Sequence, residues 1–226
     1  RSILHYICHW MNANFLKLNP EKSELLVAGS GENMWSNSFW PSEMGPTPRP
    51  AQAVKSLCLV LDANLSMSKQ VSLVCGTCIT TLRRLRRLAP LVSFSTLRVA
   101  VQATVISRLD YGNALYAGIT SQLLHKLQTV QNNAARLIYQ VPRSARASPL
   151  LRELHWLPIC QRVLFKAMCL VHRLAHGFLQ GPLDNRCIPY RPSRVLRSAL
   201  ARRMATPHFN KSTVGWRAFS SWAPRS

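Results

Sequence analysis

The stretch SKQVSLVCGTCITTLRRLRRL, residues 68–88, decides the fold class of this chain. Wound as an α-helix, it places one set of apolar side chains on a single arc: Val71, Cys75, Cys78, Leu82, Leu85 and Leu88. The opposite arc carries Arg83, Arg84, Arg86 and Arg87. Ala89-Pro90 ends the pattern, because proline does not continue a helix interior. The stretch therefore predicts an amphipathic helix with a basic outer face.

Helical spacing of apolar residues also marks other parts of the chain. We expect helices over 3–15, over 95–117, over 121–139 with Ser121 as a cap, and over 158–176. The last of these starts at Pro158 and ends at Gly177. Residues 142–149 (PRSARASP) predict a linker. After residue 180 we expect irregular structure, with a short turn of helix near 195–204.

Two short runs near the N-terminus predict strands, KSELLVAG at 22–29 and VKSLCLVLD at 54–62. We expect them to pair as an antiparallel ribbon that packs on helices, because a ribbon alone is marginally stable. The predicted fold class is mostly α with a small two-stranded β element near the N-terminus. The expected domains are 1–65, with a loop insertion at 30–54, a helical domain at 66–180 and a basic extension at 181–226.

The positive charge is concentrated after residue 50. Residues 1–50 hold four basic and four acidic side chains, so the formal net charge of +21 lies in the remaining 176 residues. There the acids are only Asp62, Asp110, Glu153 and Asp184. Such an imbalance favours a polyanionic partner, and nucleic acid releases condensed counterions when its phosphates are neutralised. The alternative is a basic tail that binds nothing in particular.

Composition further narrows the class of protein to which this chain can belong. At 226 residues with 47% apolar content, the chain predicts one large or two small folded domains. No apolar run reaches the roughly 18 residues that a membrane span needs, and no signal peptide is visible, so we expect no membrane partner. Seven cysteines without a secretion signal indicate free thiols in a reducing compartment, cytoplasmic or nuclear. The chain starts on Arg1 without a methionine, and we expect a fragment.

Seven stretches in order carry a family resemblance. They are WMNANFLKLNPEKSELLVAG (10–29), LCLVLDANLSM (57–67), SRLDYGNALYAG (107–118), LQTVQNNAARLI (127–138), LRELHWLPICQRVLFKAM (151–168), PSRVLRSALA (192–201) and GWRAFSSWAPR (215–225). Together they resemble the region downstream of the catalytic aspartates in reverse transcriptases of non-LTR (LINE-type) retrotransposons. The resemblance covers nearly the whole chain except roughly 30–53.

The resemblance implies the end of the palm subdomain, a primer-grip strand at 57–62, and a helical thumb from 66 onward with an extension. It places the paired catalytic aspartates, which hold Mg²⁺ in the intact polymerase, before Arg1, in an N-terminal polymerase region that would act in cis. The eight acids of this chain are scattered, whereas two-metal catalysis needs clustered carboxylates. We therefore expect this fragment to have no polymerase activity of its own and to need no cofactor. The resemblance implies that it binds RNA or an RNA–DNA hybrid.

The chain also departs from the family pattern. Gly112 stands in place of an expected Cys, and Cys58-Leu59 stands in place of a Gly-Val pair. The segment 34–50 has no recognisable counterpart. These departures suggest either a decayed copy or a diverged lineage.

The candidate nucleic-acid-binding residues are all arginines. Arg83, Arg84, Arg86 and Arg87 suit a phosphate backbone, and the alternative is a solvated helix face. In the tail, arginines and aromatic residues together suit single strands, or the aromatic residues anchor the tail to the core. The tail candidates are Arg191, Arg194, Arg197, Arg202 and Arg203.

Other candidates have structural or accessory roles. The resemblance gives Lys22 an accessory general-acid role in the intact enzyme, and otherwise it is an exposed lysine at a strand start. We expect structural roles for Trp156 and for Asp110. The role of Asp110 is either to pair with an arginine, with Arg108 and Arg136 as the candidate partners, or to cap a turn. We expect no metal: Cys75-x-x-Cys78 lies on an apolar arc, and no second such pair supports a zinc site with Cys169, His172 and His176. A helical protein-interaction module and a poorly folded relic remain the rival functions.

Overall fold

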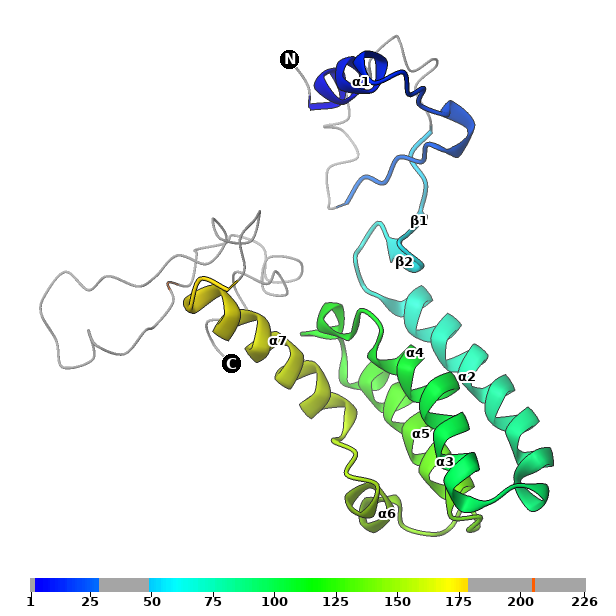
Figure 1. The fold of residues 1–226 in the computed structure, drawn as a ribbon. Coiled ribbons are helices and arrows are strands. Elements are labelled where there is room, and N and C mark those ends of the chain that lie inside the picture. Colours follow the sequence, from blue (N-terminus) through cyan, green and yellow to red (C-terminus); the bar gives the residue numbers. More distant parts are fainter. Residues whose placement is uncertain (1–2, 29–48, 179–204, 206–226) are drawn as a thin grey trace, which may run out of the picture. The chain divides into compact units, whose positions relative to one another are not determined.

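In the computed structural model, residues 3–28, 49–178 and 205 are described (Figure 1). The chain divides into two compact units, one that ends at Lys69 and one that begins at Gln70. The described residues are mostly helical, with one two-stranded antiparallel sheet near the N-terminus, which confirms the predicted fold class. The predicted helical turn at 195–204 and most of the predicted 30–54 loop lie outside the described residues.

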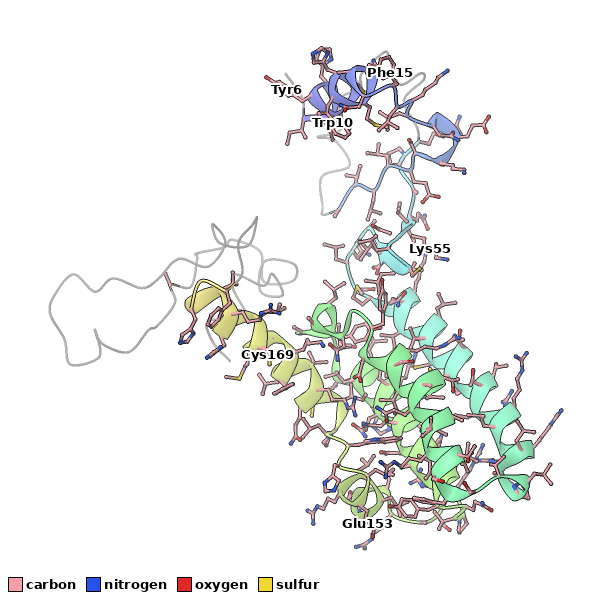
Figure 2. All side chains as sticks on the ribbon, in the orientation of Figure 1. Tyr6, Trp10, Phe15, Lys55, Glu153 and Cys169 are labelled. Carbon is pink, nitrogen blue, oxygen red and sulfur yellow. The ribbon has the colours of Figure 1, made fainter. Side chains whose placement is uncertain are left out.

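The first unit contains helix α1 (Ile3–Ala13), a 3-10 turn η1 (Pro20–Lys22) and the strands β1 (Ala53–Ser56) and β2 (Leu59–Asp62). In α1 only Cys8 is buried, while the rings of Tyr6 and Trp10 are exposed (Figure 2). Asn14 ends the helix, because its side-chain Nδ2 and its backbone N–H both donate to the carbonyl of Trp10.

The predicted pairing of 22–29 with 54–62 is wrong. The run at 54–62 folds back on itself as a hairpin, β1 against β2, in a register that pairs Ala53 with Asp62 and Ser56 with Leu59. Its two-residue turn, Leu57-Cys58, has φ values of 46° and 64°. Two positive φ values match the twist of a hairpin, which is the geometry that usually recruits Asn-Gly. The run at 22–29 contributes one isolated parallel bridge, Leu25 to Pro50.

Asp62 organises the turn that follows β2. Its carboxylate is buried and accepts hydrogen bonds from the backbone N–H groups of Ser66 and Met67, both at 2.9 Å. Burial by itself raises the pKa of Asp62, but the hydrogen bonds from Ser66 and Met67 outweigh it and hold that pKa below its usual range. This aspartate therefore works as a structural acceptor for the turn.

The second unit is a helical bundle. Its elements are α2 (Ser68–Leu88), η5 (Ala89–Leu91), α3 (Phe94–Val101), the π-helical segment η6 (Gln102–Ile106), α4 (Ser107–Asp110), η7 (Asn113–Tyr116), α5 (Ser121–Ile138), α6 (Ala147–Glu153) and α7 (Ile159–Ala175). Helix α5 is central, since α3, α6 and α7 all pack on it. Fully buried side chains such as Leu97, Leu127 and Val130 fill the core.

The predicted helices at 68–88, 121–139 and 158–176 are confirmed to within a residue as α2, α5 and α7. Gly177, with φ of 69°, ends α7 as predicted. The N-cap of α5 is Thr120 and not Ser121, which is its first helical residue.

Two predictions for the second unit are wrong. The expected continuous helix at 95–117 changes to π-helix at Gln102 and stops at Tyr111, because Gly112 takes a left-handed conformation with φ of 63°. The expected linker at 142–149 contains the start of α6. Pro149 fits there because the N–H groups of a first helical turn have no intrahelical acceptor.

Candidate nucleic-acid interface

The outer face of α2 presents the basic patch, defined as Arg83, Arg84, Arg86 and Arg87. All four side chains are exposed, while Val71, Cys78 and Leu82 on the inner face are buried. The thiol of Cys78 lies 3.9 Å from the carbonyl oxygen of Val105 and attaches α2 to η6. The patch occupies about 6 Å of helix length at 1.5 Å per residue, so its charges are closely spaced.

The dipole of α2 explains only part of the patch. The C-terminal dipole of α2 favours cations, but its effect fades beyond the last turn. Only Arg86 and Arg87 lie in that turn. The dipole therefore does not account for Arg83 and Arg84, which add charge further along the same face.

Carboxylates do not neutralise the patch within the described residues. Between Gln70 and Phe178 the sequence has fourteen arginines and lysines against two acids, Asp110 and Glu153. Arg162 binds Asp110, and the Tyr139 hydroxyl donates to Glu153. Burial, followed by this hydrogen bond and the charge of Glu153, raises the pKa of Tyr139. Each acid thus has a partner other than the four arginines of the patch.

The partner predicted for Asp110 is wrong. Arg162 of α7, rather than Arg108 or Arg136, places Nη1 2.7 Å from Oδ1 and 2.6 Å from Oδ2 of Asp110. Arg162 also donates from Nε to the carbonyl of Leu157, at 2.9 Å. Asp110 therefore connects the end of α4 to α7, 52 residues along the chain.

Trp156 and Lys22 occupy different settings. Trp156 is buried, and its backbone N–H donates to the carbonyl of Leu151 at 2.8 Å. Lys22 is exposed at the end of η1, so it does not start a strand as predicted. The tail candidates lie outside the described residues, and their role stays a prediction: Arg191, Arg194, Arg197, Arg202 and Arg203.

The cysteine and histidine pairs do not converge. Cys75 and Cys78 are buried, and burial raises the pKa of Cys75 and raises that of Cys78 to about 11. Both side chains therefore lie in the apolar interior, as core cysteines do. The rings of His172 and His176 stack 4.1 Å apart. Across the parts of the chain that the structure describes, no three His, Cys, Asp or Glu side chains gather into a group that could hold a metal ion.

Sequence reasoning missed a recess that Arg136 and Arg143 line together with Arg86 of the patch. Arg136 lies among apolar residues of α5 and Arg143 lies in the expected linker, so no local pattern groups them with Arg86. The only available signal was the excess of arginine over acid in this part of the chain.

Among the described helices, none combines the length and the apolar character that crossing a membrane requires. Comparison of the chain with models of known families, with curated protein sequences and with solved structures found no match.

Proposed function

We propose that this chain binds nucleic acid through the basic patch on α2. The observation that carries the proposal is four exposed guanidinium groups on one helix face, with no carboxylate partner among the described residues. Closely spaced like charges repel one another, and a phosphate backbone relieves that repulsion while it releases counterions. Guanidinium forks match phosphate oxygens in pairs, so such a face follows a backbone without reading bases.

The choice of nucleic acid rests on the resemblance to reverse transcriptases of non-LTR retrotransposons. That resemblance favours RNA and RNA–DNA hybrid as ligands, and we propose that the chain derives from the thumb region of such an enzyme. On this proposal it grips a duplex for a polymerase site located elsewhere in the parent protein.

A second candidate function is a helical protein-interaction module, and α7 is the observation that favours it. Its inner face buries Val163 and Ala167, but Phe165 and Met168 remain 60% and 48% exposed. Exposed apolar side chains grouped on one helix are typical of surfaces that pack on a partner.

The dependence of binding on salt tests the proposal. Fluorescence anisotropy with a labelled RNA–DNA hybrid gives the slope of log K against log salt concentration for the full chain. Replacement of all four patch arginines by Gln, which preserves helix propensity, is expected to reduce that slope by about 3.6, or about 0.9 for each phosphate that the protein no longer neutralises.

A matched control removes the same charge elsewhere. Lys126, Arg152, Lys166 and Arg173 are also exposed, and their replacement by Gln is expected to change the slope by less than about 1. An equal decrease of the slope in the two variants would show that net charge alone, and not the patch, determines the salt dependence of binding. An unchanged slope in the patch variant would remove α2 from the interface and favour the protein-interaction module.

A further inference from the structure

A recess lies beside the patch, at one end of the bundle. The connection from α2 to α3 and the connection from α5 to α6 meet at that end (Figure 1). Between them the structure has a hollow of about 280 Å³. Arg86, Arg136 and Arg143 line it, over an apolar floor that includes Ala89 and Leu137.

Three hydrogen bonds hold the residues of the recess in place, one between its two sides and two on the side formed by α5 and the connection after it. Gln140 has a left-handed φ of 52°, and its Nε2 donates to the carbonyl oxygen of Ala89 at 3.2 Å. Arg136 donates from Nε to the carbonyl of Ala145 at 2.9 Å and from Nη1 to Oδ1 of Asn133 at 3.3 Å. These bonds fix the orientation of the Arg136 side chain before a ligand binds, which lowers the conformational entropy that binding must remove.

The chemistry of the lining selects the ligand. Among the described residues, three arginines and no acidic side chain line the recess. A carboxylate ligand offers two oxygens, whereas a phosphoryl group offers three or four acceptors that can serve several arginines together. The volume is slightly below the roughly 300 Å³ at which pockets for drug-sized ligands begin, and it suits one phosphate with part of its attached group.

We propose that this recess is a phosphate-binding subsite that holds one phosphate of the bound nucleic acid. The inference deepens the proposed function and rests on it. Because Arg86 belongs both to the patch and to the recess, a backbone that follows the patch reaches the subsite directly. The subsite then fixes the register of the backbone at the end of α2.

Arg143 and Arg146 give a matched pair of variants. Both are exposed arginines of the same connection, but only Arg143 lines the recess. Arg143→Gln is expected to weaken binding of the RNA–DNA hybrid by about tenfold, the loss typical of one hydrogen bond to a charged group, while Arg146→Gln changes it less than about twofold. Equal losses in the two variants would overturn the subsite.

A second measurement tests the recess in the absence of nucleic acid. Inorganic pyrophosphate, titrated into the full chain, is expected to shift the NMR signals of the Nε–H groups of Arg86, Arg136 and Arg143, and to leave that of Arg146 in place. This result does not depend on nucleic-acid binding, so failure of the salt test and failure of the subsite are distinguishable. Unmoved signals would overturn the subsite even if the patch binds duplex.

Two further comparisons identify the kind of ligand that supplies the phosphoryl group. Shifts with pyrophosphate, combined with unchanged hybrid binding by Arg143→Gln, would assign the recess to a free phosphate ligand and overturn its role in nucleic-acid binding. Poly-glutamate is expected not to displace pyrophosphate. Displacement by poly-glutamate as effective as that by the hybrid would show that the recess accepts acidic protein segments, which also overturns the proposal.

Discussion

The contact between Asp110 and Arg162 predicts a measurable coupling between α4 and α7. Replacing Asp110 by Asn keeps the shape of the side chain and removes its charge. Replacing Arg162 by Met keeps much of the stem and removes the donors. In the structure Nη1 of Arg162 lies 2.7 Å and 2.6 Å from the two carboxylate oxygens, and the side chain of Arg162 is 15% exposed.

The expected coupling free energy between Asp110 and Arg162 follows from this geometry. A hydrogen bond to a charged group contributes about 1.5–3 kcal/mol, whereas a fully exposed ion pair contributes about 0–1 kcal/mol. The side chain of Asp110 is 36% exposed, so solvent screens part of the attraction. We expect a coupling free energy of about 1–2 kcal/mol between the two positions. Arg162→Met alone costs more than Asp110→Asn, because it also removes the bond to the carbonyl of Leu157.

A double-mutant cycle in urea unfolding, followed by the helical circular dichroism signal, measures this coupling. A second cycle, Asp110→Asn with Arg108→Met, tests the partner that sequence alone suggests and is expected to show no coupling beyond about 0.3 kcal/mol. Coupling to Arg108 in place of Arg162, or to neither, would refute the arrangement of α4 against α7.

Two other predictions concern the hairpin and the buried thiols. Because Leu57 and Cys58 both have positive φ, Leu57→Asn with Cys58→Gly is expected to stabilise the first unit by about 1–2 kcal/mol, and an unchanged thermal midpoint would contradict that turn. The raised pKa of Cys78, about 11, means that the thiolate is scarce until the pH approaches that value. At pH 8 its alkylation by iodoacetamide, followed by mass spectrometry, is expected to be at least about a hundredfold slower than that of the exposed Cys160, and equal rates would contradict its burial.

The sequence predicts well the helices whose signals are local. Helix α2 combines a long apolar arc with a stop at Ala89-Pro90, and α7 combines Pro158 with Gly177, so their bounds follow from residues within each segment. The start of α6 is harder to predict, because Ser148-Pro149 is typical of a linker although proline is also tolerated in a first helical turn.

Features that depend on distant residues are not predictable in the same way. The run at 54–62 predicts one strand where the structure has a hairpin, because its turn residues, Leu57 and Cys58, lack the usual Asn-Gly signal. The partner of Asp110 lies 52 residues away and is chosen by the packing of α7. For the candidate interface, amphipathicity identifies the patch on α2, but the recess needs two chain connections to meet, which no spacing in the sequence encodes.

The π-helical turn at 102–106 changes which residues of this helix face the interior of the bundle. In an ordinary α-helix adjacent residues point about 100° apart, and a π-helical turn holds an extra residue that resets the phase. Here Val105 and Ile106 are neighbours and are both buried. A related protein with an ordinary α-helix at this place would have one residue fewer. Its interior residues would then correspond to those of this chain only with a one-residue gap inside the helix.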